Sequence, residues 1–276
     1  MKVLAFNGSP KMDKGNTALI LNPFLQGMRE AGAEVELFYT KRLDIGPCQG
    51  EFNCWLKTPG KCHQDDDMQM LHPKLREAGI WVLATPLYVW GVSGPLKNVM
   101  DRLIPLIEPY IELRNGHCSH PLRDGTGRAK IVLVSNCGFW ETDNFYPMLF
   151  QVETLCDTIG FEFAGALLRP HGPALAAMLE AGAPVQDVLL AAREAGRQLV
   201  TDGRIPQPSC RRLAAICCPG TYISKWRTTS SGRSWIHWRQ QPAHRRKRQR
   251  PRSGLPHATT VRPVPAPHSS RCGCGR

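Results

Sequence analysis

The chain has 276 residues, 42% of them hydrophobic, which is enough to form the core of one or two domains. No run of about 18 apolar residues occurs, so we expect no membrane span. The first residues, MKVLAFNGSPK, do not form a secretory signal. We expect a cytoplasmic protein, in which eleven cysteines favour thiols, a metal site or catalysis over disulfides.

The formal net charge of +12 is unevenly divided along the chain. Residues 1–205 carry a net charge of −3, whereas residues 206–276 carry 15 basic residues and no acid. The second segment also lacks a sustained apolar period, so it cannot bury enough surface to offset its chain entropy. We therefore predict a folded domain over residues 1–205 and a disordered basic tail, rich in Pro and Arg, over residues 206–276.

Apolar runs and helical periods alternate along the first 205 residues. Strands are predicted at residues 2–6, 34–39, 80–85, 129–135 and 161–168. Helices are predicted at residues 17–32, 68–78, 94–107, 144–159 and 184–202. This order is typical of a mostly parallel sheet with helices on both faces. The predicted fold class is α/β, a flavodoxin-like doubly wound parallel five-stranded sheet, with half of a Rossmann domain as the alternative.

The loop after the first strand has the composition of an anion site. Ser9 and Lys11 lie in it, and Asn16 and Thr17 stand where the next helix starts and where such residues often cap. Free N–H groups at a helix start, together with the helix dipole, favour a phosphate. The stretch contains neither G-x-x-x-x-G-K-[ST] nor G-x-G-x-x-G, which excludes those two phosphate-binding motifs. An ordinary strand–turn–helix with a good N-cap is the alternative.

The loop after the strand at residues 80–85 carries aromatic side chains. Its sequence, PLYVWGVSGPLKNVMDR, places Tyr88 and Trp90 beyond the carboxyl end of that strand. A flat aromatic ligand can stack on such a loop and bond to its backbone N–H groups. In the flavodoxin strand order, flavin mononucleotide (FMN) binds between the first and third strands. The alternative is that the two aromatic side chains only cover the sheet edge.

Together, the segments GSPKMDKGNT and TPLYVWGVSGPLKNVMDR resemble the two signatures of flavodoxin-like NADPH-dependent FMN reductases. The closer resemblance is to the branch that includes iron–sulfur flavoproteins, and it covers residues 1–205. It implies an FMN-dependent oxidoreductase that passes electrons from NAD(P)H through bound FMN to a small acceptor such as a flavin or quinone. It also implies a homodimer or homotetramer. No side chain is required for the hydride step, so no catalytic residue is predicted.

The same resemblance implies FMN contacts in three loops. The phosphate would be held by Ser9, Lys11, Asn16 and Thr17. The isoalloxazine ring would be lined by Pro86, Leu87, Tyr88, Val89, Trp90 and Gly91. A third loop, SNCGFWETDNF, would close over the other side of the ring with Asn136, Cys137, Gly138 and Trp140, although a plain strand-end turn is an equal alternative. His171 in RPHGP is a further candidate, for which a surface position is the more ordinary interpretation.

The iron–sulfur branch carries four clustered cysteines, the first three spaced C-x-x-C-x-x-C. Here Cys48 and Cys54 occupy the first and third places, Glu51 stands in the second, and Cys62 fits the fourth. A [4Fe–4S] cluster normally requires four thiolates, so we do not expect an intact cluster and predict no metal ligand.

The residues of this loop allow two other interpretations. Zinc on three cysteines plus His63 is disfavoured because Cys62 and His63 are adjacent. Free thiols near the flavin or a subunit interface are the preferred interpretation. Asp65, Asp66 and Asp67 are expected to be solvated at a helix start.

Rival functions stay open beside the reductase. One is a non-enzymatic flavodoxin-like electron carrier, against which the weak charge of −3 argues; another is an iron–sulfur flavoprotein with an atypical cluster. The tail stretch HRRKRQRPR, with Trp226, Trp235 and Trp238, has the composition to bind nucleic acid. We favour a tail that left its ancestral reading frame near Arg211, and we expect neither nucleic acid nor a membrane as a partner.

Overall fold

The computed structural model describes residues 1–114, 116–205, 222–228 and 234–240. The chain divides into two compact units, Met1–Cys218 and Pro219–Arg276. The sequence places the boundary at about residue 205, but residues 206–221 lie outside the described residues, so that boundary stays a prediction. Most of the predicted disordered tail also lies outside them, at residues 206–221, 229–233 and 241–276.

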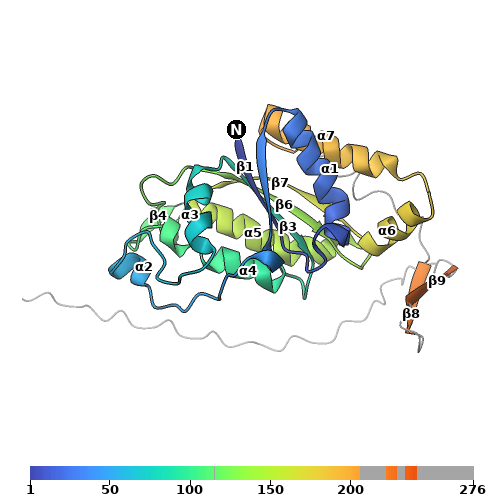
Figure 1. The fold of residues 1–276 in the computed structure, drawn as a ribbon, viewed down its shortest axis with the longest axis horizontal. Helices are drawn as coiled ribbons and strands as arrows, with labels where there is room; N and C mark the ends of the chain where they lie inside the picture. The colour runs from blue at the N-terminus through green and yellow to red at the C-terminus, as the bar shows by residue number, and fades with distance from the viewer. Residues whose placement is uncertain (115, 206–221, 229–233, 241–276) are drawn as a thin grey trace, which may run out of the picture. The chain divides into compact units, whose positions relative to one another are not determined.

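The first unit is built on a five-stranded parallel sheet (Figure 1). Its strand order is β2-β1-β3-β6-β7, which is the flavodoxin-like order. The strands are β1 (Lys2–Asn7), β2 (Glu34–Tyr39), β3 (Ile80–Pro86), β6 (Lys130–Asn136) and β7 (Glu162–Arg169). The three central strands are nearly continuous apolar runs, as expected for strands buried on both faces. The predicted fold class is confirmed.

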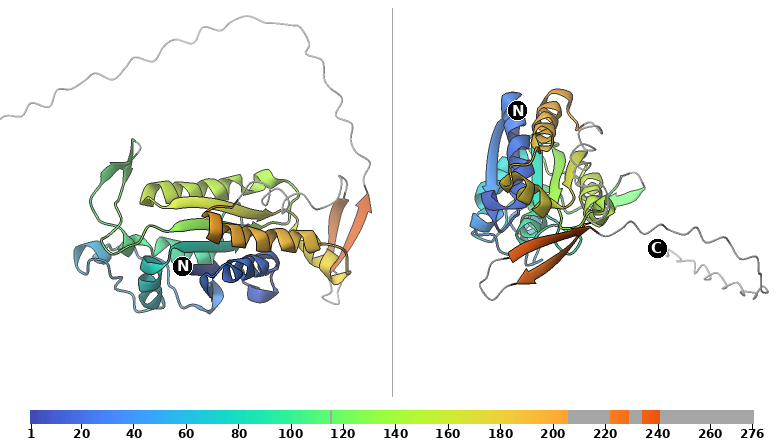
Figure 2. Two further views of the ribbon diagram at one scale, coloured as in Figure 1. Left: turned by 90° about the horizontal axis from the view of Figure 1, so that it is seen from above. Right: turned by 90° about the vertical axis from the view of Figure 1, so that its right-hand side faces the viewer.

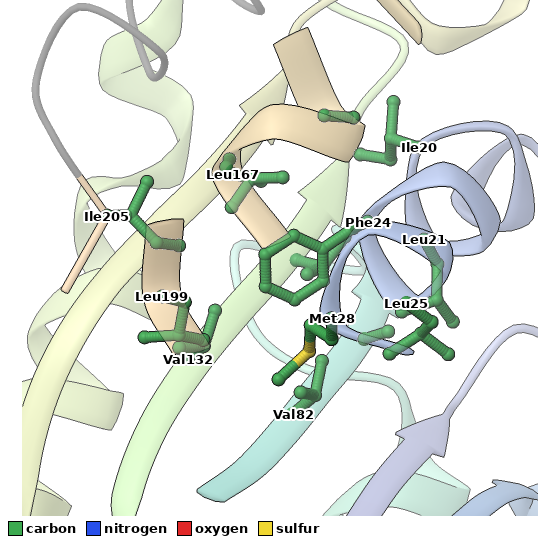
Figure 3. Packing of buried hydrophobic residues seen from close by; sticks show 14 of the residues in the cluster. Ile20, Leu21, Phe24, Leu25, Met28, Val82, Val132, Leu167, Leu199 and Ile205 are labelled. Atoms are coloured by element: carbon green, nitrogen blue, oxygen red, sulfur yellow. The ribbon is translucent and has the colours of Figure 1, made fainter. Parts of the chain in front are cut away.

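Helices cover both faces of this sheet (Figure 1). One face packs against α1 (Asn16–Glu30), α6 (Gly172–Glu180) and α7 (Gln186–Asp202). The other packs against α3 (Met68–Glu77), α4 (Gly94–Asp101) and α5 (Tyr146–Ile159). Figure 3 shows the first core, where Phe24 and Met28 of α1 and Leu199 of α7 lie side by side against the sheet. Two separate cores therefore hold the strands in place and fix the loops at their ends.

Helices α1 and α7 touch through their backbones. A Cβ atom at Gly27 would lie 1.8 Å from the carbonyl oxygen of Arg193, and one at Gly196 would lie 2.0 Å from that of Phe24. No side chain fits at either distance, so both positions require glycine. This close contact with α7 fixes the position of α1, including its first residues next to the loop that follows β1.

Helix boundaries differ from the predicted ones at prolines. The helix predicted over residues 94–107 ends at Asp101, and the short 3-10 turn η3 (Ile104–Leu106) follows, because Pro105 has no N–H with which to continue a helix. The helix predicted from residue 144 is preceded by η4 (Thr142–Phe145) and starts at Tyr146, with proline in its first turn.

Several short elements were not predicted from the sequence. They are η1 (Met12–Lys14), η2 (Thr40–Arg42), α2 (Asn53–Leu56), α6, the hairpin β4 (Glu112–Arg114) with β5 (His117–Ser119), and the pair β8 (Tyr222–Thr228) with β9 (Ser234–Gln240). The β4–β5 hairpin, green in Figure 2, reaches away from the main sheet. Among the described residues, every helix is too short or too polar to cross a bilayer.

Candidate functional site

A cleft opens beyond the carboxyl ends of β1, β3 and β6. Its volume is about 200 Å³, and it is open to solvent on one side. Its lining residues are Ser9, Lys11, Gly15, Asn16, Thr17, Pro86, Leu87, Tyr88, Asn136, Cys137, Gly138 and Pro173. Ten of these were candidate site residues from the sequence; Gly15 and Pro173 were missed, the latter because α6 was not predicted. The three loops that the sequence singled out therefore meet around one space.

The first loop, residues 8–15, is fixed by its own polar groups. Buried Asn7 accepts the Ser9 N–H at 2.9 Å, and the Ser9 hydroxyl oxygen accepts the Lys11 N–H at 3.3 Å. The loop also packs against the loop after β3, whose Ser93 hydroxyl donates to the Gly8 carbonyl at 2.8 Å. A Cβ atom at position 8 would lie only 2.6 Å from that hydroxyl oxygen. These internal hydrogen bonds therefore fix the shape of the loop.

Helix α1 begins at Asn16 with Gly15 as its N-cap residue, and no side chain caps it. The predicted capping by Asn16 and Thr17 is therefore wrong. Thr17 is 1% exposed, and its hydroxyl oxygen accepts the side-chain amide of Asn136 at 2.7 Å. The Ala18 N–H donates to the Gly15 carbonyl at 2.9 Å. Among the described residues no side-chain oxygen caps the N–H groups of Asn16 and Thr17 beside the cleft, and the helix dipole favours an anion there. Lys11 adds a positive charge, and no lining residue is acidic.

The loop after β3 carries a tight two-residue turn. Tyr88 and Gly91 exchange backbone N–H···O bonds of 3.0 Å, and Val89 and Trp90 between them have φ values of +48° and +57°. Non-glycine residues in this region cost about 1–3 kcal/mol each and often occur at functional sites. Tyr88 lines the cleft, whereas Val89 is 91% and Trp90 53% exposed at the turn. Val89, Trp90 and Gly91 lie outside the cleft lining.

The third loop, after β6, is tied to both neighbours. The carbonyl of Asn136 accepts the Leu87 N–H at 2.8 Å, while its side chain reaches Thr17. The Cys137 thiol donates to the carbonyl of Phe139 at 3.3 Å. Burial raises the pKa of Cys137, although backbone hydrogen bonds lower it in part, so this side chain stays a neutral thiol at neutral pH. Cys137 is therefore suited to packing against a ligand.

Trp140 does not line the cleft but stacks on His171, with ring centroids 4.0 Å apart. His171 is 3% exposed and has a φ of +51°, and its backbone N–H donates to Phe139 at 2.7 Å. The surface position expected for it is therefore wrong. Burial lowers the pKa of His171 below its ordinary value, and the charge of Arg169 lowers it further, so its imidazole is neutral. The sequence could not place Trp140 over it.

The cysteine loop, residues 44–67, is closed by a buried ion pair. The Arg102 guanidinium, 1% exposed, lies 2.6 Å from one carboxylate oxygen of Asp66 and 3.0 Å from the other. It also donates to the Cys62 sulfur at 3.2 Å. The expectation that Asp66 is solvated is wrong, since its side chain is only 7% exposed.

The described cysteines are all free thiols. Within the described ranges, no three His, Cys, Asp or Glu side chains are grouped closely enough to hold a single metal ion. His63 is paired instead with Glu51, its Nδ1 atom lying 2.8 Å from a carboxylate oxygen.

A parallel sheet in this strand order, with an anion-favouring loop at its switch point, defines a flavodoxin-like nucleotide-binding protein. The sequence profile of the NADPH-dependent FMN reductase family matches residues 1–117. An iron–sulfur flavoprotein of Methanocaldococcus jannaschii is 35% identical over 142 residues, 51% of this chain and 67% of that protein. A second from the same organism is 36% identical over 151 residues, 54% of this chain and 75% of that protein. The chain belongs to this reductase family, in its iron–sulfur flavoprotein branch.

Other similarities cover less of the chains or are of lower sequence identity. The chain spans 48% of an Archaeoglobus fulgidus iron–sulfur flavoprotein to which it is 37% identical over 102 residues, 37% of this chain. A solved flavone reductase shares the fold, with a TM-score of 0.51 and 16% identity, covering 87% of this chain and 81% of that one. At that identity the likeness concerns the fold alone.

Proposed function

We propose that this chain is an FMN-dependent NAD(P)H oxidoreductase that passes electrons to a small acceptor such as a flavin or quinone. The observation that carries the proposal is the cleft at the switch point, where an uncapped helix start and Lys11 favour an anion beside a wall that includes Tyr88. Family membership supports it. FMN, when bound, supplies the hydride-accepting chemistry.

The cleft has two regions, one for the FMN phosphate and one for the flavin ring. Ser9, Lys11, Asn16 and Thr17 surround the helix start and would hold a phosphate. Pro86, Leu87 and Tyr88 on one side, and Asn136, Cys137 and Gly138 on the other, would line a flat ring. The neutral Cys137 thiol places no charge against that ring. The chain itself thus binds and orients, and no side chain is assigned a proton transfer.

We further propose that the protein acts in the cytoplasm as a homodimer or homotetramer. The free thiols of the described cysteines support a cytoplasmic location, because an oxidising compartment would favour disulfide bonds. Exposed Val89, Trp90 and Phe139, on two of the three loops, support self-association, because apolar side chains around a site often mark an interface.

Steady-state turnover separates this reductase from an electron carrier. Purified full-length chain with added FMN is expected to oxidise NADPH or NADH continuously when a quinone or free flavin is present. A carrier would undergo at most one reduction per bound flavin and then stop. Absence of turnover with every acceptor tested, in a chain that holds flavin, would leave the carrier as the better description.

Thr17→Val is expected to weaken FMN binding about 10- to 100-fold. The Thr17 oxygen accepts the Asn136 amide, so its own O–H can donate toward the cleft, and hydrogen bonds to charged groups contribute about 1.5–3 kcal/mol. Titration of the unliganded chain with FMN, followed by flavin fluorescence, measures the change. Thr201→Val, on the far end of α7, is the matched control and should leave the affinity unchanged. Equal affinity in both variants would remove Thr17 from the site.

A further inference from the structure

The cysteine loop differs from what the names of its relatives imply. A [4Fe–4S] cluster takes four cysteine thiolates. The loop supplies three, Cys48, Cys54 and Cys62, and places Glu51 between the first two, three residues from each. A carboxylate is a harder donor than a thiolate and suits iron–sulfur chemistry poorly. The donor set of this loop therefore does not fit a four-thiolate cluster.

The carboxylate at position 51 is also engaged within the protein. A Glu51 oxygen lies 2.8 Å from Nδ1 of His63, and both side chains are about one-third exposed. His63 directly follows Cys62, so this pair joins the two ends of the cysteine-bearing segment. Glu51 is thus paired with His63 of the same chain, at the position where a fourth thiolate would stand.

Side-chain contacts to Arg102 and Trp55 hold this loop in place. Arg102, buried under the loop, bonds to the Gly46 carbonyl at 2.9 Å, to both oxygens of Asp66 and to the Cys62 sulfur at 3.2 Å. The Trp55 indole N–H also bonds to the carbonyl of Ile107 at 3.0 Å. A loop built around a cluster depends on the metal for its fold; this one has a guanidinium in its interior instead.

We propose that this chain is a cluster-free member of the iron–sulfur branch, in which Glu51 stands where a thiolate would complete the set of four ligands. The Arg102–Asp66 pair organises the loop in place of iron. Because iron and sulfide are measured directly, the proposal stands or falls independently of flavin binding.

The test is anaerobic reconstitution of the full chain with ferrous iron and sulfide, followed by desalting and assay of iron and acid-labile sulfide. The wild-type chain is expected to retain less than about half an iron atom per chain. Glu51→Cys, which completes the thiolate set, is expected to retain about four of each. Glu51→Ala is the matched control: it removes the carboxylate and its bond to His63 but adds no thiol, and should behave as the wild type.

Two results would overturn the proposal. Retention of about three or four iron atoms by the wild-type chain would show that three thiolates suffice. A Glu51→Cys chain that melts at the wild-type temperature but holds no more iron than Glu51→Ala would show that the thiolate missing at position 51 is not what excludes the cluster. If Glu51→Cys fails to fold, the wild-type measurement still decides the first point, and Glu51→Ser with Glu51→Ala reports whether position 51 tolerates change.

Discussion

Gly196→Ala is expected to lower the free energy of unfolding by more than about 3 kcal/mol, which is a large part of the stability of a typical domain. The added methyl group would lie 2.0 Å from the carbonyl oxygen of Phe24 and 2.9 Å from its carbon. Both groups belong to backbone in the middle of helices, so neither can move aside as a flexible side chain does. The two helices must separate, and the core between α1 and the sheet loosens with them.

Denaturant unfolding of the full chain measures this effect. Gly94→Ala is the matched control, because a Cβ at Gly94, the first residue of α4, meets nothing within 4 Å. That variant should be as stable as the wild type or up to about 1 kcal/mol more stable, since alanine restricts the unfolded chain. Similar stabilities for Gly196→Ala and Gly94→Ala would contradict the close crossing of α1 and α7.

Asp66→Asn is expected to cost about 3–5 kcal/mol, because it leaves the buried Arg102 guanidinium without its counter-charge. The substitution keeps the size of the side chain, so packing is little changed and the loss is electrostatic. Asp101→Asn is the control: the Lys97–Asp101 pair is close to half exposed and should contribute at most about 0.5 kcal/mol. Thermal or denaturant unfolding at pH 7 compares the three chains.

The same ion pair predicts how the difference depends on pH. Burial by itself raises the pKa of Asp66, but the hydrogen bonds from Arg102 and from the backbone N–H groups of Met68 and Gly46 outweigh it and hold the pKa below its ordinary value. A lowered folded-state pKa stabilises the fold above the unfolded value, about 3.9, and this contribution is lost as the pH falls through the folded pKa. The wild-type chain should therefore approach Asp66→Asn in stability below about pH 4. A difference that stays constant down to pH 2 would contradict this account.

The sheet could be predicted from the sequence because its central strands are apolar runs that no amphipathic helix would show. The cleft could be predicted because motifs at strand ends must meet at one edge of a parallel sheet. What escaped prediction depends on contacts between distant segments. The crossing of Gly27 and Gly196 and the burial of Asp66 on Arg102 join residues far apart in the chain, and no local pattern pairs them.

Within the site, too, some positions could be predicted from the sequence and others could not. The residues at the helix start and residues 136–138 line the cleft, where the family resemblance had implied that they would meet. Val89 and Trp90 do not, because a two-residue turn with positive φ carries them away from it, and a sequence such as YVWG does not show the sign of φ. His171 is buried by a stacking partner, Trp140, that approaches from another loop.

The most direct test of the central claim is an anaerobic titration of the full chain, first with FMN and then with NADPH, followed by visible absorption. We expect one FMN bound per chain, and flavin bands that bleach as NADPH is added, because the proposed function places a phosphate and a flat ring in the cleft. A chain that is folded yet takes up no FMN would contradict the account and leave only a flavodoxin-like fold.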